Sequence, residues 1–121
     1  MKFRVQGNTI RFRLNRREVE QFQSTGVVSA AVHFPAGSAL TYSLVSAGES
    51  LSAAFDGAEI RIGVPKTMAD AWTATDEVGM NGTVSLAGGD VLHIVIEKDF
   101  QCLHKGEAAK DPDAYPNPMA V

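Results

Sequence analysis

The chain has 121 residues, of which 45% are hydrophobic and 21% are charged, a composition typical of one globular domain. A chain of this length buries enough surface to fold without disulfides or a structural metal. The formal net charge of -3 provides no bulk attraction to nucleic acid or to an anionic membrane. Cys102 is the single cysteine, which excludes an internal disulfide and a cysteine-rich zinc site and favours a reducing compartment.

The first residues, MKFRVQGNTIRFRL, alternate basic and apolar side chains and so lack the uninterrupted apolar stretch of a signal peptide. The longest apolar tract, residues 91–96, is interrupted by His93 and is far shorter than a membrane span. We therefore expect a cytoplasmic protein with no membrane partner.

Residues 2–14 have the pattern of a β-hairpin with one buried and one wet face. The apolar face carries Phe3, Val5, Ile10, Phe12 and Leu14, and the opposite face carries Lys2, Arg4, Arg11 and Arg13. Gln6-Gly7-Asn8 supplies the turn between the two strands.

A short helix is predicted directly after this hairpin. Asn15 and Glu18 have the spacing of a capping box, and Gly26 is a suitable left-handed stop. Strands over residues 27–34 and 39–45 are predicted next, joined by Pro35-Ala36-Gly37-Ser38.

The second half of the chain predicts a similar order of elements. Strands over residues 51–55 and 59–64 flank the turn Asp56-Gly57. A helix follows Pro65, with Thr67 and Asp70 as a second capping pair.

Three more strands are predicted over residues 78–80, 83–86 and 91–98, separated by turns at Asn81-Gly82 and Gly88-Gly89. Residues 91–96 are apolar on both faces apart from His93. This pattern indicates a central strand or a strand covered by the C-terminal segment.

Residues 5–28 match residues 55–78 without a gap, which predicts a duplicated unit. Five of the 24 positions are identical, namely Gly7/Gly57, Ile10/Ile60, Arg11/Arg61, Thr25/Thr75 and Val28/Val78. The alternative is that any two hairpin-plus-helix segments resemble each other to this degree.

Together these patterns predict an α+β fold, mostly antiparallel β with about eight strands and two short helices from a duplicated β-β-α-β-β unit. The strands form either a small barrel or two packed sheets. We expect a single domain over residues 1–103, with pseudo-repeats at about 1–48 and 51–100. Residues 104–121 are predicted to be an extended C-terminal tail, for which Leu103, Tyr115 and Met119 are the candidate anchors.

The basic face of the first hairpin is the sharpest chemical candidate. We take Arg4, Arg11, Arg13 and Arg61 as candidate anion-binding residues, since guanidinium groups hold phosphate through paired hydrogen bonds. Arg61 is included because it stands at the repeat position of Arg11. The alternative is a solvated face whose cations pair with the nearby carboxylates, namely Glu59, Glu97 or Asp99.

Nucleic-acid binding on this face would need aromatic side chains among the cations. Phe3 and Phe12 are predicted to point to the opposite, apolar face of the hairpin. The pattern therefore argues against a nucleic-acid partner.

Cys102 and His104 are the candidate metal ligands, because a thiolate and an imidazole at this spacing can both bind a metal, with Asp111 or Asp113 completing the shell. The spacing is unusual for a structural zinc site and a second pair of strong ligands is missing. A lone cysteine is usually a small buried side chain. With no P-loop, no dinucleotide-binding glycine pattern and no hydrolase motif, the sequence predicts no cofactor and no catalytic residue.

The opening K-F-R-V-Q-G-N-T-I-R-F-R-L, followed by R-R-E-V-E-Q-F, and the closing E-K-D-F-Q-C-L, followed by D-A-Y-P-N-P, resemble a family of small uncharacterised bacterial proteins. The resemblance covers nearly the whole chain. It implies a free-standing bacterial protein and brings no activity, ligand or catalytic residue with it.

The leading hypothesis is a non-enzymatic binding or interaction module of a bacterial cytosol, with a protein or a small anion as its partner. The alternative is an anion- or phosphate-binding protein or enzyme that uses the basic face. The position of the arginines discriminates between them, because a binding or catalytic site requires them to converge on a concave pocket.

Overall fold

The computed structural model describes residues 1–100 and Tyr115 of the chain. The strands are β1 (Lys2–Gln6), β2 (Thr9–Leu14), β3 (Val27–His33), β4 (Ala39–Ser46), β5 (Ser52–Phe55), β6 (Glu59–Val64), β7 (Gly79–Ser85) and β8 (Val91–Lys98). The helices are α1 (Arg16–Thr25) and α2 (Lys66–Thr73). A 3-10 turn, η1 (Pro35–Gly37), connects β3 to β4, and another, η2 (Ala87–Gly89), connects β7 to β8.

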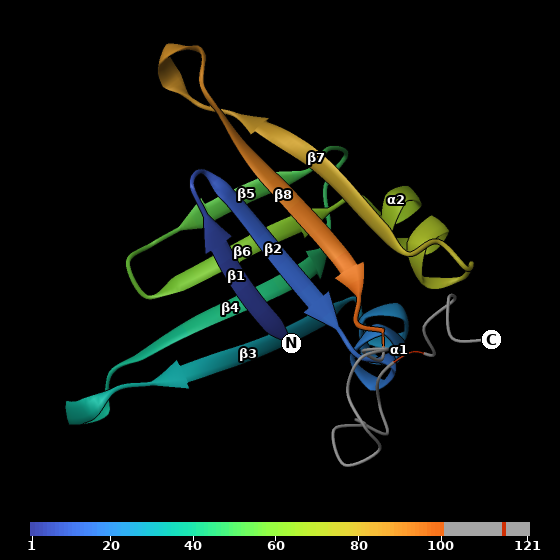
Figure 1. Cartoon of the computed structure of the whole chain (residues 1–121), viewed down its shortest axis with the longest axis horizontal. Coiled ribbons are helices and arrows are strands. Elements are labelled where there is room, and N and C mark those ends of the chain that lie inside the picture. Colours follow the sequence, from blue (N-terminus) through green and yellow to red (C-terminus); the bar gives the residue numbers. More distant parts are fainter. Residues whose placement is uncertain (101–114, 116–121) are drawn as a thin grey trace.

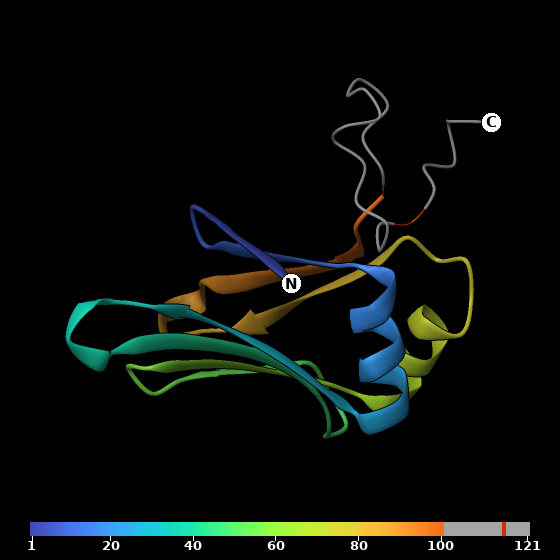
Figure 2. The same cartoon turned by 90° about the horizontal axis from the view of Figure 1, so that it is seen from below.

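The strands form two four-stranded sheets that pack face to face, so the fold is α+β with two packed sheets and not a closed barrel (Figure 1). Sheet A has the order β1-β2-β8-β7 and sheet B has the order β3-β4-β6-β5. The two helices close one end of the layered structure (Figure 2). The strands of the two sheets cross at an angle, so the β7–β8 and β3–β4 turns lie far apart in Figure 1.

Each sheet combines one hairpin from the first half of the chain with one from the second half. All four hairpins are antiparallel, whereas the two central pairs, β2 with β8 and β4 with β6, are parallel. The parallel pairs arise because α1 carries the chain from sheet A to sheet B and α2 carries it back. Sequence patterns predicted these four hairpins but also an additional turn within β7, and they missed the parallel pairing between the halves.

The two halves share one pairing register. In β2 Arg11 lies opposite Val95 of β8, and in β6 Arg61 lies opposite Ser43 of β4. The first hairpin and helix of each half therefore correspond at an offset of 50 residues, and the second hairpins at an offset of 52. Single hydrogen bonds repeat in the same way: Asp99 N–H donates to the Leu14 carbonyl at 2.8 Å, and Ala47 N–H donates to the Val64 carbonyl at 2.9 Å.

Residues 9–25 and residues 59–73 both run from a central strand through one residue into a helix. This shared path is the one that a duplicated unit would follow. The duplication itself stays a prediction.

The two helices begin differently. Asn15 accepts from Glu18 N–H at 3.0 Å while the Glu18 side chain accepts from Asn15 N–H at 2.9 Å, so the predicted capping box of α1 is confirmed, and Gly26 ends the helix with φ 79°. The predicted capping pair of α2 is wrong. Its N-cap is Pro65, with no side-chain cap, and Asp70 pairs with Lys66 at 2.8 Å instead.

The predicted turn at Asn81-Gly82 is also wrong, because both residues lie within the continuous strand β7 and pair with β8. Gly82 packs against Leu51 and makes no turn. A Cβ at this position would lie 2.8 Å from Leu51 Cδ2, so a larger residue requires the end of the Leu51 side chain to move.

The core lies between the two sheets and includes an aromatic contact between the two helices. Phe22 of α1 and Trp72 of α2 are buried, with ring centroids 6.5 Å apart in an edge arrangement. Trp72 Nε1 donates to the Val78 carbonyl at 3.1 Å, which ties α2 to the segment leading into β7. The pair therefore holds together the two crossings between the sheets.

We predict that Trp72→Ala lowers the free energy of unfolding by about 3 to 5 kcal/mol, because it removes a fully buried ring. Urea denaturation followed by far-UV circular dichroism measures this loss. Trp72→Phe is the matched control, since it keeps a ring and removes the hydrogen bond to Val78; its loss should be smaller. A loss under about 1 kcal/mol in Trp72→Ala would contradict the buried position of the ring.

The end of β8 is covered by one residue of the C-terminal segment. Tyr115 forms a parallel β-bridge with Phe100, its N–H donates to the Asp99 carbonyl at 2.8 Å, and its ring centroid lies 5.8 Å from that of Phe100. Burial raises the pKa of Tyr115. The other expected anchors, Leu103 and Met119, and the rest of the predicted tail lie outside the described residues.

Lys98 lies beneath this ring. Its ammonium donates to the Thr75 carbonyl at 2.7 Å and lies 5.8 Å from the ring centroid of Trp72 and 5.6 Å from that of Tyr115. Burial lowers the pKa of Lys98, against the opposing effect of Asp76 and Glu77. The two rings thus compensate a buried ammonium for part of its lost hydration.

We predict that Tyr115→Ala lowers the free energy of unfolding by about 1 to 2 kcal/mol, because the mutation uncovers Phe100 and Lys98. Differential scanning calorimetry of the full chain measures the change as a lower melting temperature. Tyr115→Phe keeps the ring and should melt close to the unmodified protein. Equal melting of all three proteins would show that the ring does not cover the end of β8 in solution.

Candidate functional site

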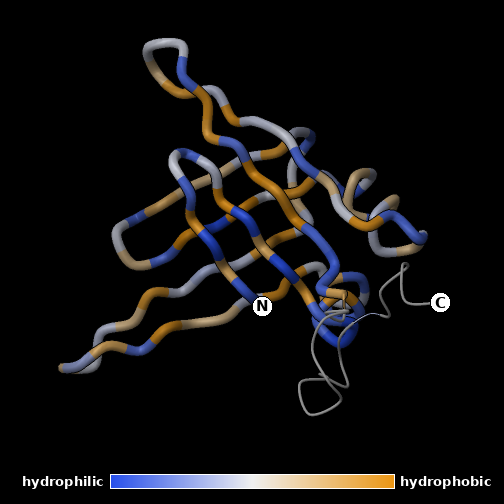
Figure 3. Tube along the Cα trace, viewed as in Figure 1, coloured by the Kyte–Doolittle hydropathy of each residue, from blue (hydrophilic) through white to orange (hydrophobic). Residues whose placement is uncertain are grey.

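The basic face lies on the outer surface of β1 and β2, away from the core. The alternation of basic and apolar residues along these strands places four cations outward, and Figure 3 shows it as alternating blue and orange segments. Pairing sets Arg4 opposite Arg11 and Lys2 opposite Arg13. Like charges directly opposite each other destabilise a sheet, so these two pairings do not by themselves favour the fold.

The four cations surround a shallow hollow of about 160 Å³. Its lining residues are Lys2, Phe3, Arg4, Arg11 and Arg13. The arginine side chains offer several hydrogen-bond donors in planar forks that match the oxygens of phosphate or carboxylate. The hollow therefore has the charge and the donors needed to bind a small oxyanion.

Carboxylates of the neighbouring segment neutralise part of this face. Glu97 Oε1 accepts from Arg11 and from Arg13, each at 3.1 Å, and Asp99 pairs with Lys2 at 2.7 Å. These are the partners expected of a solvated face. Among the described residues, no carboxylate pairs with Arg4.

Arg61 lies apart from the other candidates. Its strand, β6, belongs to sheet B, where its guanidinium pairs with Glu59 at 3.0 Å. The structure brings together Arg4, Arg11 and Arg13 with Lys2 and leaves Arg61 on the other sheet. Arg61 cannot share a ligand with the basic face, because the core lies between them.

Corresponding strands in the two halves carry different outward side chains. Lys2, Arg4, Arg11 and Arg13 correspond to Ser52, Ala54, Arg61 and Gly63. The register of the two hairpins is the same, so a sheet of this shape forms without three of the four cations. The basic face is therefore a property of the first half alone.

The expected aromatic geometry is confirmed on the inner side of the same hairpin. Phe3 and Phe12 point into the space between the sheets, where the Phe3 ring stacks on Tyr42 with centroids 4.9 Å apart. These two rings are therefore not on the basic face, where they could stack on bases.

The chain also contains a hollow that sequence reasoning did not identify. It measures about 220 Å³, lies between the sheets near the hairpin turns, and is lined by Ile10, Ala53, Ala54, Phe55, Ile60, Ile62 and Leu92. One feature of the sequence could have indicated this hollow. Ala53, with a small side chain, stands at the position where the first half has the large Phe3.

The model of a family of unknown function, DUF7009, matches residues 1–119. The chain belongs to this family. No curated protein and no solved structure matches the chain.

The candidate metal ligands cannot be placed in the structure. Cys102 and His104 lie outside the described residues, as do Asp111 and Asp113. Within the described part of the chain, no group of three or more histidine, cysteine, aspartate or glutamate residues could hold a metal ion. In the same part, neither helix has the length and apolar character needed to cross a membrane.

We predict that Glu97→Gln destabilises the protein by about 1 kcal/mol at low salt, because Arg11 and Arg13 lose the carboxylate that separates their charges. Urea denaturation at low and at high salt measures the loss, which should shrink as salt screens the four cations. Glu59→Gln, which breaks the pair with Arg61 on sheet B, is the matched control and should show a weaker salt dependence. A loss in Glu97→Gln that is independent of salt would contradict repulsion among the cations.

Proposed function

We propose that the protein is a non-enzymatic binding module whose basic face holds a small oxyanion, a phosphate or a carboxylate. The observation that carries this proposal is the hollow of about 160 Å³ bounded by Lys2, Arg4, Arg11 and Arg13. Opposed cations cost stability unless an anion lies between them, and the corresponding hairpin of the second half forms without three of these charges.

The proposed ligand is small because the hollow is small and part of the charge is already neutralised. Glu97 and Asp99 hold three of the four cations, so an entering anion meets Arg4 first and then competes with Glu97 for Arg11. This competition favours an oxyanion that makes paired hydrogen bonds over a simple halide.

We further propose that the protein acts in a bacterial cytosol, as a member of a family of small bacterial proteins. The single cysteine supports a reducing compartment, and the motifs at the two ends of the chain support the bacterial assignment. The duplicated unit belongs to the same proposal and is supported by the shared register of the two halves.

The experiment is a thermal-shift measurement of the full chain in phosphate against chloride at matched ionic strength. Phosphate at ten times its dissociation constant should stabilise the protein by about 1.4 kcal/mol, a rise of several degrees in the melting temperature. Arg4→Ala and Arg11→Ala should each remove this rise while leaving the melting temperature in chloride nearly unchanged, since exposed pairs contribute only about 0.2 to 1 kcal/mol.

Arg61→Ala is the matched control, because it removes an arginine from the corresponding position of sheet B. It should keep the full phosphate effect. No difference between phosphate and chloride in the unmodified protein would overturn the proposal, and loss of the effect in Arg61→Ala would place the binding elsewhere.

A further inference from the structure

One edge of sheet B carries a row of backbone groups that point away from the sheet. Its strand is β3, which runs along the rim of sheet B (Figure 1). At one end of the strand Ser46 N–H donates to the Gly26 carbonyl at 2.7 Å, and at the other end Phe34 N–H donates to the Ser38 carbonyl at 2.8 Å. Because bonded and non-bonded pairs alternate along an antiparallel ladder, the even-numbered residues of this segment bond to β4. The odd-numbered residues point their N–H and C=O groups to the open edge, and they are Val27, Ser29, Ala31 and His33.

The part of this edge that can accept another strand is limited at both ends. Val27 N–H donates to the Thr25 hydroxyl at 3.3 Å, and the same hydroxyl donates to the Val27 carbonyl at 2.9 Å, so the edge groups of Val27 are already paired. At the other end Pro35 has no N–H. Among the described residues, no group bonds to the edge N–H and C=O groups of the three positions between them, Ser29, Ala31 and His33.

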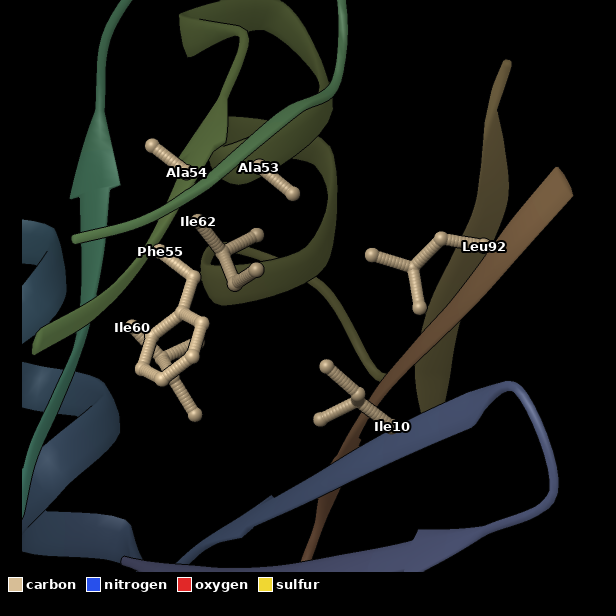
Figure 4. Close-up of a pocket in the computed structure, with 7 residues that line it drawn as sticks. All are labelled: Ile10, Ala53, Ala54, Phe55, Ile60, Ile62 and Leu92. Carbon is tan, nitrogen blue, oxygen red and sulfur yellow. The ribbon is translucent and has the colours of Figure 1, made fainter. Parts of the chain in front are cut away.

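The other three sheet edges are protected in ways that β3 is not. β1 carries Lys2 and Arg4, and charged side chains on an edge discourage pairing with a further strand. β5, beside the hollow in Figure 4, has only four residues. β7 contains Gly79 and Gly82, and glycine weakens a strand. β3 has seven residues, with no glycine, proline, lysine, arginine or carboxylate among them.

The surroundings of this edge are uncharged and partly apolar. Residues 27–48, which form β3, β4 and the turn between them, contain no lysine, arginine, aspartate or glutamate, although such residues make up 21% of the chain. Two copies of this edge therefore meet without like-charge repulsion. Val32 is 45% exposed and Phe34 is 53% exposed, so large apolar side chains lie beside the unpaired backbone groups.

From this open and uncharged edge, we propose that β3 pairs with β3 of a second copy of the chain, antiparallel and about a two-fold axis at Ala31. The two B sheets then form one continuous sheet. Ala31 bonds to Ala31 of the second copy, and Ser29 bonds to His33 of the second copy, which uses every unpaired group of the edge. The basic face lies on sheet A and is not part of this contact.

The edge is complementary to itself, which favours a second copy over another partner. In this register Val27 lies opposite Pro35, so the two positions that cannot extend the ladder meet each other. On the inner face of the sheet, the exposed Val32 lies opposite Ala30. Phe34 lies opposite Val28, a core residue, so the contact extends the core from one copy to the next.

The first test uses the unmodified full chain. Sedimentation velocity at protein concentrations from about 5 to 500 μM should show a monomer that converts to a dimer, because a ladder of this length makes a small interface. Amide exchange followed by nuclear magnetic resonance should be at least about tenfold slower for Ser29, Ala31 and His33 at the high concentration than at the low one. Asn81 and Thr83, whose N–H groups face the open edge of β7, are the internal comparison and should exchange rapidly at both concentrations.

The second test places charges on the two-fold axis. Ala31→Lys and Ala31→Glu each put like charges opposite each other and should weaken the dimer at least about tenfold. An equimolar mixture of the two variants should dimerise again, since lysine then lies opposite glutamate. Thr83→Lys is the matched control, because it adds the same charge at an exposed edge position of β7, and it should leave the dimer unchanged.

Several outcomes would overturn the proposal. A monomer at every concentration would leave the edge to a strand of another protein, and slow exchange of the Ala31 amide at every concentration would show that the edge is covered within one chain. A dimer that survives both Ala31 variants, one that is lost in Thr83→Lys, or a mixture of folded Ala31 variants that stays monomeric would contradict the two-fold axis. If an Ala31 variant does not fold, amide exchange in the unmodified chain decides.

Discussion

The parallel pairing of β2 with β8 is the constraint on which the rest of the fold depends. It joins residues 9–14 to residues 93–98, so sheet A is complete only when the last strand has reached the first hairpin. Sheet B has the same requirement, because β4 pairs with β6, although these strands are closer together in the sequence. Neither half can form its sheets alone, because each hairpin needs a hairpin of the other half beside its inner strand.

The helices follow from this exchange. A chain that leaves sheet A and must continue in sheet B crosses from one layer to the other, and α1 and α2 make the two crossings at the same end of the molecule. Their contact through Phe22 and Trp72 closes that end. Away from the helices, large apolar residues next to the hairpin turns, such as Phe34 and Phe55, are exposed.

The two halves have the same backbone register and use it for different surfaces. The first hairpin points four cations outward and the rings of Phe3 and Phe12 inward. At the corresponding positions, its counterpart points one cation, Arg61, and three small residues outward, and points Ala53 and Ile62 inward. Differences of this kind are not needed to form the sheets, since both hairpins form with either set. They are therefore the part of the sequence from which a function is best inferred.

The ion pairs on the basic face do not by themselves explain why its cations are there. Each pair with Glu97 or Asp99 is partly exposed, and water and salt reduce what such pairs contribute. Among the described residues, two carboxylates face four cations, and Arg4 is the cation that neither of them contacts.

The sequence by itself determined the local elements: the alternation of residues 2–14, the capping box of Asn15 and Glu18, and the left-handed glycine at position 26 each act within a few residues of the chain. It also determined which side of the first hairpin is charged, because side chains alternate along a strand. Only the tertiary structure decided that β8 lies parallel to β2, that Arg61 is separated from Arg11, that Gly82 packs beside Leu51, and that Ala53 borders a hollow. Those features depend on contacts between residues about 20 to 90 positions apart, which local patterns do not encode.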